Sequence, residues 1–197
     1  KSVQSADGEI LLGGERGGEP ITGFDLGNSP FEWSRSVVAD REIAFTTTNG
    51  TQALLRCAWA ERIVTGAFVN LSAVVDFLIN DERPIHLVCA GTVGKVSTED
   101  CLFAGAVVDG LLNSVDQNAG TVDGTFGLCD ASRLVYSHWK TVTESPDGLF
   151  QAMKVGSGGR NLMRLGLEAD IRTAATPDQV DLVPEYLPQS RRISRLS

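Results

Sequence analysis

The sequence predicts an α/β protein, built as a three-layer α/β/α sandwich with a mixed or largely parallel sheet. Stretches typical of strands and of helices alternate from the first apolar run to about residue 113, which is the pattern of such a sandwich. Residues 84–89 are continuous in their hydrophobicity, as expected of a strand buried on both faces. Polar loops follow several predicted strands, and ligands of α/β sheets bind at strand ends.

The elements of the first part of the chain are the clearest. Strands are predicted over residues 9–12, 42–47, 62–66 and 84–89, and helices over residues 51–60, 71–79 and 101–115. Asn70 stands where it would cap the second of these helices, and Ser97 stands where it would cap the third. Acidic residues in the first turn of the third helix suit the helix dipole.

The second part of the chain gives a weaker signal. Residues 119–124 read as a turn-rich connector, and helices are predicted over residues 128–139, 149–153 and 159–166. Short strands are expected over residues 170–173 and 180–183, and a polar, basic tail from about residue 188 is expected to be frayed. No linker separates two domains, so residues 1–197 are expected to form one domain.

Composition excludes several classes of function. A net charge of −8 and a pI near 4.7 are unsuited to nucleic acid or a membrane surface, because both are polyanions that need a basic face. No apolar run approaches the roughly 18 residues of a membrane span. The four cysteines form no closely spaced pair, and residues 1–9 lack the apolar core of a signal peptide, so a cytoplasmic protein with reduced thiols is expected.

The first polar segment surrounds Arg16. Glycines flank this arginine within residues 13–18, and a second glycine-containing stretch follows over residues 23–30. Glycine allows a close approach of the backbone to a ligand, and arginine can bind a planar anion with two hydrogen bonds. The alternative is a glycine-rich turn with an exposed arginine.

The second segment, residues 46–51, joins a predicted strand to a predicted helix. It is rich in threonine, and backbone N–H groups at a helix start together with hydroxyl groups can bind an anion. The alternative is a common turn at Asn49 and Gly50, followed by an ordinary N-cap at Thr51.

The third segment runs over residues 89–100. The spacing from Gly91 to Lys95 is too short for a nucleotide-binding P-loop, but Lys95 remains a candidate charge for an anion. Glu99 and Asp100 are candidate ligands of Mg²⁺, which takes one or two carboxylates with water and substrate oxygens. Acids in a first helical turn also occur only to suit the helix dipole.

Other reactive side chains are weaker candidates. Cys89 lies at a predicted strand end, where a lowered pKa would make it a nucleophile and a position in the core would make it inert. His86 and His138 read as structural residues. Neither a Ser-His-Asp arrangement nor a cluster with zinc-ligand spacing can be assembled.

Taken together, five motifs resemble the successive signatures of the 2-phosphosulfolactate phosphatase family. They are Gly14-Glu-Arg-Gly-Gly, Gly23-Phe-Asp-Leu-Gly-Asn-Ser-Pro, Thr46-Thr-Thr-Asn-Gly-Thr, Cys89-Ala-Gly-Thr-Val-Gly with Ser97-x-Glu-Asp, and Ser157-Gly-Gly-Arg-Asn-Leu. The resemblance implies Mg²⁺-dependent hydrolysis of 2-phospho-3-sulfolactate, a step on one route to coenzyme M, on a three-layer α/β/α fold. In that family a further strand and a loop resembling Asp-Val-x-Arg-Ala-Thr/Ser come first, and no match to them occurs in this sequence.

The resulting hypothesis assigns three sets of residues. The catalytic candidates are Arg16, Asp100 and Glu99, and the metal candidates are Asp100, Glu99 and Asp25. The substrate-binding candidates are Asn28, Ser29, Thr47, Thr48, Asn49, Gly50, Thr51, Gly91, Thr92 and Lys95. Two alternatives stay open, a phosphatase for another phospho-2-hydroxy acid and a non-catalytic anion-binding domain. The nucleophile and the presence of a homo-oligomer also stay open.

Overall fold

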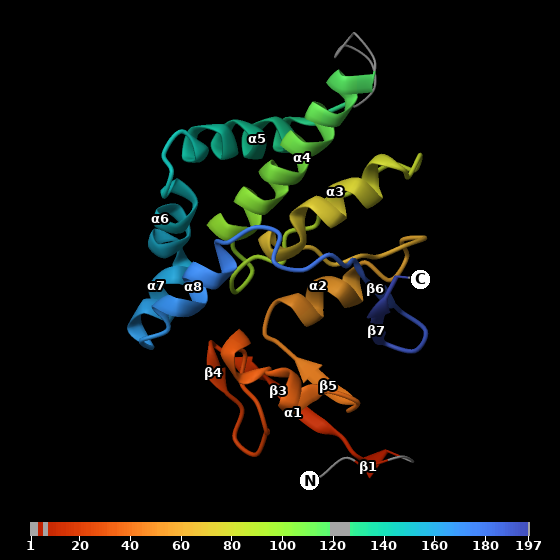
Figure 1. Cartoon of the computed structure of the whole chain (residues 1–197), viewed down its shortest axis with the longest axis vertical. Coiled ribbons are helices and arrows are strands. Elements are labelled where there is room, and N and C mark those ends of the chain that lie inside the picture. Colours follow the sequence, from red (N-terminus) through yellow and green to blue (C-terminus); the bar gives the residue numbers. More distant parts are fainter. Residues whose placement is uncertain (1–3, 6–7, 119–126, 197) are drawn as a thin grey trace.

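The computed structural model describes residues 4–5, 8–118 and 127–196. A small sheet with β3, β4 and β5 lies at the lower end, and helices α4 to α8 form the upper part (Figure 1). Helix α2 (Gly50–Arg56) lies between these two parts. The α/β class is therefore confirmed, whereas the three-layer sandwich stays a prediction.

The sheet is mixed, as the sequence predicts. Its central strand, β3 (Leu11–Arg16), pairs in parallel with β5 (Ile43–Thr46) and antiparallel with β4 (Glu19–Pro20). Gly14 lies opposite Thr46 at a φ of 140°, and a Cβ at this position would collide with the Thr46 carbonyl. The predicted glycine-rich loop is therefore a strand as far as Arg16, because glycine lets the two backbones come close.

Helices occupy most of the remaining described chain. The longer ones are α3 (Leu71–Ile79), α4 (Thr98–Asn118), α5 (Asp130–Thr143), α6 (Gly148–Val155), α7 (Ser157–Arg164) and α8 (Glu168–Ala174). Shorter turns of helix are η1 (Pro30–Glu32), α1 (Arg35–Val38) and η2 (Phe68–Asn70). The helices predicted over residues 51–60, 71–79, 101–115, 128–139, 149–153 and 159–166 are confirmed, with shifted ends in all but the second.

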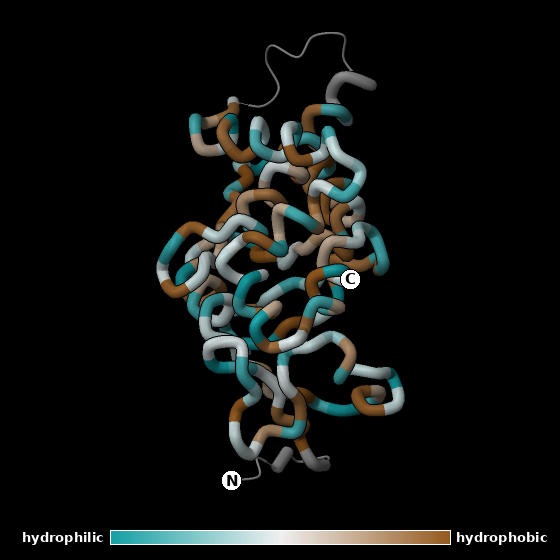
Figure 2. Tube along the Cα trace, turned by 90° about the vertical axis from the view of Figure 1, so that its left-hand side faces the viewer, coloured by the Kyte–Doolittle hydropathy of each residue, from teal (hydrophilic) through white to brown (hydrophobic). Residues whose placement is uncertain are grey.

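Helix α4 lies at the centre of the hydrophobic core. Its Leu102 packs with Phe68 and Ile171 in one buried cluster, and its Val107 packs with Val75 in a second cluster. Leu102 and Val107 are fully buried. Figure 2 shows apolar stretches gathered inside this upper, helical half of the molecule. Within the described residues, no helix has the length and apolarity needed to span a membrane.

Two predicted caps bind differently from the expectation. Asn70 precedes α3, but its side chain accepts a hydrogen bond from the Ala67 N–H and donates one to the Leu182 carbonyl. Ser97 precedes α4, and its hydroxyl is buried with no hydrogen-bond partner among the described residues. Residue type therefore identified both helix starts, although neither side chain caps its helix.

The predicted strand over residues 84–89 is wrong for the described structure. Ile85 and Leu87 pack against the second core cluster, while Pro84, His86 and Val88 are exposed. The segment is thus half-buried, and it pairs with no described strand. Hydrophobicity placed it against the core, but a strand also requires a neighbouring edge to bond with.

The strands predicted over residues 9–12 and 42–47 are confirmed, with shifted ends, by β3 and β5, whereas the other strand predictions need correction. Residues 62–66 contribute one isolated bridge, from Val64 to Glu185, and residues 170–173 belong to helix α8. The predicted strand over residues 180–183 is replaced by β6 (Pro184–Leu187). Within the tail from residue 188, β7 (Arg192–Arg195) pairs with β6 as an antiparallel hairpin. The connector predicted over residues 119–124 lies outside the described residues.

Candidate anion-binding site

Arg16 lies where the two parallel strands end. Its Nη1 donates to the Glu15 carbonyl at 2.8 Å, and its Nη2 donates to Thr46 Oγ1 at 3.2 Å. Thr46 is the last residue of β5, so the guanidinium joins the carboxyl ends of two adjacent strands. The side chain is exposed, and these two bonds use two of its five N–H donors. A ligand at the strand ends would meet an arginine that is already oriented.

Glu15 is the buried acid of this region, and the sequence did not identify it as a site residue. Its Oε1 accepts from the Thr48 N–H at 2.6 Å, and its Oε2 accepts from the Gly18 N–H at 2.7 Å and the Thr48 hydroxyl at 3.1 Å. Burial alone would raise the pKa of Glu15, but these three bonds and the charge of Arg16 outweigh it, so that the pKa is lowered.

The threonine loop is largely satisfied by the protein itself. Thr47 N–H donates to Thr51 Oγ1 at 3.0 Å, and Thr51 N–H donates to Thr47 Oγ1 at 3.3 Å. Thr48 N–H is bound to Glu15. Three amides that the sequence suggested as anion donors are thus engaged, which leaves charged side chains as the main means of binding an anion here.

The third loop contacts the second, as the sequence predicts. Asn49 Oδ1 accepts from the Val93 N–H at 3.1 Å, and Asp100 Oδ2 accepts from the Gly91 N–H at 2.6 Å. Between these points, Thr92 and Lys95 exchange two backbone hydrogen bonds across a tight turn. The loop is therefore held between the start of α2 and the first turn of α4.

The adjacent acids of α4 point in different directions. Asp100 faces Gly91, and burial, together with the charge of Glu99, raises its pKa against the lowering effect of the Gly91 N–H. Glu99 faces α7 instead, where a Cβ at Gly158 would collide with Glu99 Oε1. Glu99 Oε2 is buried and has no hydrogen-bond partner in the described part of the chain. Neighbouring helical residues point about 100° apart, which accounts for the divergence.

Asp25, Asn28 and Ser29 are not brought to Arg16. Asp25 Oδ2 accepts from the Leu12 N–H at 2.8 Å, and Leu12 precedes Arg16 on β3 by four residues, or about 13 Å of extended strand. Ser29 donates to Asp170 in α8, and Asn28 lines an apolar hollow with Trp33, Ile43 and Phe45. Among the described residues, no group of three or more His, Cys, Asp or Glu is placed to hold a metal ion.

Helix α7 forms a wall of the site that sequence reasoning left without a role. Asn161 Nδ2 donates to the Gly17 carbonyl at 3.2 Å, and Arg164 Nη2 donates to Asn161 Oδ1 at 2.7 Å. Gly17 N–H in turn donates to the Thr48 hydroxyl at 3.2 Å. The motif starting at Ser157 was recognisable in the sequence, but its contact with the Gly17 loop depends on the tertiary fold.

Cys89 fits neither of its two interpretations. The residue is exposed, so it is not a core thiol. Partial burial of the thiol, with the charge of Asp100 and the neighbouring Cys101, raises its pKa to about 11. A thiol with this pKa is protonated at neutral pH and is a poor nucleophile.

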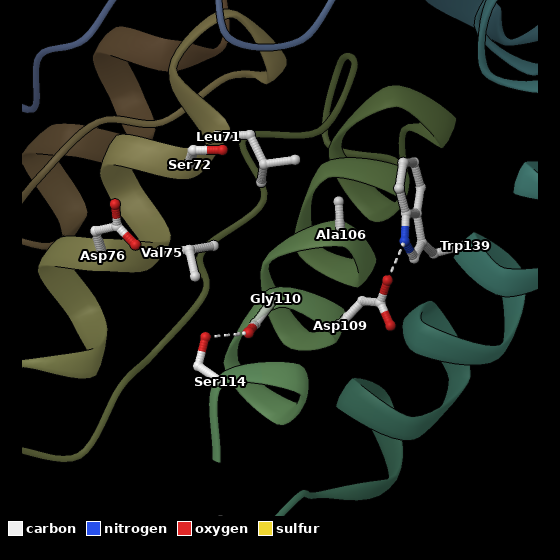
Figure 3. Close-up of a pocket in the computed structure, with 9 residues that line it drawn as sticks. All are labelled: Leu71, Ser72, Val75, Asp76, Ala106, Asp109, Gly110, Ser114 and Trp139. Carbon is white, nitrogen blue, oxygen red and sulfur yellow. Dashed lines mark hydrogen bonds between the residues drawn. The ribbon is translucent and has the colours of Figure 1, made fainter. Parts of the chain in front are cut away.

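A separate hollow of about 230 Å³ lies between α3 and α4, with Trp139 of α5 at its edge (Figure 3). Its polar side chains include Asp76 and Asp109, and Asp109 accepts from Trp139 Nε1 at 3.1 Å and from Lys140 Nζ at 3.3 Å. The aspartates that line the hollow would repel a phosphate ester. The hollow is therefore unsuited to the anion expected at the strand ends.

Comparison with known proteins gives a consistent result. A family model described as 2-phosphosulpholactate phosphatase matches residues 1–189. A Caldanaerobacter subterraneus subsp. tengcongensis protein named "Probable 2-phosphosulfolactate phosphatase" is 39% identical over 89% of this chain and 68% of its own length. Proteins with the same name from Clostridium perfringens and Deinococcus radiodurans are 34% and 37% identical, over 94% and 95% of this chain and 70% and 73% of their own lengths.

Proposed function

The chain belongs to the 2-phosphosulpholactate phosphatase family, as its motifs predict, and on this premise we propose that it hydrolyses the phosphate monoester of a small 2-hydroxy acid. It is accordingly an enzyme of the phosphoric monoester hydrolase class. The proposed substrate is 2-phospho-3-sulfolactate, with 3-sulfolactate and phosphate as products. This reaction is the step toward coenzyme M that the motif resemblance implies.

The observation that carries the proposal is the position of Arg16. A phosphate monoester carries about −1.5 to −2 charges at neutral pH, and a protein with a net charge of −8 must bind it through local cations. The Arg16 guanidinium is oriented by Thr46 and by the Glu15 carbonyl at the ends of β3 and β5. Its planar fork matches two phosphoryl oxygens and can stabilise the charge that develops on them.

Further cations lie on the segments around Arg16. Lys95 belongs to the loop that Asn49 contacts, and Arg164 is bound to Asn161, which itself contacts Gly17. We assign these two side chains to the carboxylate or sulfonate of the substrate, because Arg16 alone cannot balance three anionic groups.

Mg²⁺ is the proposed cofactor. Because Glu99 and Asp100 point in different directions, its proposed protein ligand is either Glu99 or Asp100. The buried Glu99 Oε2 has no partner in the described residues, and a cation would satisfy it. Among the described residues, Asp25 does not join these two acids in a group that could hold a metal ion, and so it is not a proposed ligand. When bound, Mg²⁺ would supply charge neutralisation at the phosphoryl group.

Phosphate release from 2-phospho-3-sulfolactate and from phospholactate, measured with Mg²⁺ and with excess EDTA, tests the proposal. We expect faster release from the sulfonated substrate and loss of activity in EDTA. Faster release from phospholactate would favour the phosphatase for another 2-hydroxy acid. Full activity in EDTA would exclude the metal role, and the absence of release from both substrates would favour a non-catalytic anion-binding domain.

A further inference from the structure

Glu15 places a carboxylate beside a site that is proposed to bind an anion. It is 7% exposed, and the next residue along β3 is Arg16. A buried negative charge close to a phosphate would weaken phosphate binding unless the protein neutralises that charge. The presence of the Glu15 carboxylate beside the proposed anion site therefore needs a physical explanation.

The geometry of the strand end provides that reason. Successive side chains of a strand point to opposite faces, so Glu15 and Arg16 extend to opposite sides of β3. Arg16 contacts Thr46, the last residue of β5, and Glu15 contacts Thr48, two residues farther along the chain. The loop after β5 is thus held from both faces of the neighbouring strand.

Both oxygens of the Glu15 carboxylate accept hydrogen bonds. The carboxylate accepts two bonds from Thr48 and one from Gly18, all between 2.6 and 3.1 Å. Gly17, next to Gly18, is held by the Thr48 hydroxyl and by Asn161 of α7. The Glu15 carboxylate therefore joins the end of β3 to the threonine loop and to Gly18, and the donors of Thr48 and Gly18 compensate its negative charge.

We propose that Glu15 is a positioning residue, which fixes residues 46–48 against the end of β3 and thereby holds the Arg16 guanidinium in the orientation that binds an anion. Only the identity of that anion as a phosphate ester rests on the proposed function. A misplacement of about 1 Å in a binding group can reduce a rate 100-fold, so the loss of the Glu15 hydrogen bonds should have a measurable effect on anion binding.

The first test uses Glu15→Gln and inorganic phosphate as the ligand. Glutamine keeps the shape of glutamate but presents an NH₂ group to either Thr48 or Gly18. At least one of the three hydrogen bonds that Glu15 accepts is therefore lost. We expect the dissociation constant of phosphate, measured by calorimetry, to rise about tenfold. The matched control is Glu19→Gln, which removes an exposed charge from β4 opposite Arg16 and should not weaken phosphate binding.

A double-mutant cycle distinguishes positioning from general stabilisation. Arg16→Ala should weaken phosphate binding, and adding Glu15→Gln to Arg16→Ala should cause little further loss, because the glutamate acts through the arginine. Additive losses would overturn the proposal, and so would wild-type phosphate affinity in Glu15→Gln. Thermal melting of each variant shows whether it is folded. Should Glu15→Gln not fold, Thr48→Val removes the hydroxyl that donates to Glu15 and accepts from the Gly17 N–H, and it should also weaken phosphate binding.

The outcomes for this residue and for the proposed function can be separated. Coupling between Glu15 and Arg16 in phosphate binding, without turnover of any phosphate ester, would retain the positioning role and reject the phosphatase. Turnover by the wild type, with additive losses in the double-mutant cycle, would retain the phosphatase and reject the positioning role. No binding of phosphate by the wild type would overturn the positioning role.

Discussion

The strand ends and the helical core of this protein are held together by different forces. Around α4, fully buried apolar side chains such as Leu102 and Val107 provide the contacts. At the ends of β3 and β5, side chains of Glu15, Arg16 and Asn49 bind the backbone or hydroxyl groups of nearby loops. Helix α2, which follows the threonine loop, buries none of its residues. We infer that packing sets the stability of the fold, whereas directed polar contacts set the geometry of the site.

Among the variants that test this comparison, Leu102→Ala is expected to have the largest effect, a loss of stability. Leu102 is fully buried in the helical core, and truncation of such a residue removes about 2–5 kcal/mol from the free energy of unfolding. Denaturant unfolding measures this loss. The activity of the remaining folded protein should match that of the wild type, and a large change in KM would show that the two regions are not separate.

Arg16→Lys should have the opposite profile. Lysine retains the charge but not the planar fork, so kcat/KM should fall roughly 30-fold. This corresponds to a loss of about 2 kcal/mol in transition-state stabilisation. Because Arg16 is exposed, the midpoint of denaturant unfolding should barely move. Near-normal kcat/KM in this variant would reduce Arg16 to a surface residue.

Asp100→Asn and Glu99→Gln test which acid at the junction of the two regions acts through its charge. A dipole role predicts a loss of about 1 kcal/mol in stability at most, with an unchanged Mg²⁺ dependence. A ligand role predicts a higher Mg²⁺ concentration for half-maximal rate, with melting in EDTA little changed. We expect Glu99→Gln to show the larger change, since Glu99 Oε2 has no described partner. Wild-type Mg²⁺ dependence in both variants would exclude both as ligands.

The smallest effect is expected from the pH dependence of Glu15. Its pKa is lowered in the folded chain, so its ionised form stabilises the fold above the ordinary glutamate pKa of about 4.3. This contribution is lost as the pH falls through the lower, folded value. Denaturant unfolding of the wild type and Glu15→Gln over this acidic range should therefore converge as the pH decreases. A constant difference between the two would show that the charge of Glu15 is not involved.

The sequence predicted local structure better than pairing between segments. Helix α3 was predicted to the residue, because its apolar pattern and preceding Asn70 are local signals. The segment 84–89 and the strand expected over residues 170–173 failed for a different reason. Hydrophobicity indicates burial, but whether a short segment becomes strand or helix depends on neighbours that lie far away in the chain.

The site shows the same limit. The meeting of the threonine loop with residues 91–95 was predicted from the rule that strand ends converge. The bond from Val93 to Asn49 agrees with the contact, but residues 84–89 form no strand, so the rule does not account for it. Glu15 was missed because its partner Thr48 is 33 positions away, and a single glutamate among glycines carries no local signal. Asp25 had the right chemistry for a metal ligand, but its carboxylate is used to bind the Leu12 N–H.

Helix α7 touches both ends of the candidate site, and this fixes the spacing between them. Gly158 lies against Glu99, and Asn161, three residues later, binds Gly17. Each helical residue adds about 1.5 Å of rise and 100° of rotation, so these two contact points are related by a rigid length of helix. One residue inserted between them would leave Gly158 in place and turn the Asn161 amide away from Gly17. The separation of the acid pair from the Gly17 loop is therefore set by the number of residues between these two contact points in α7.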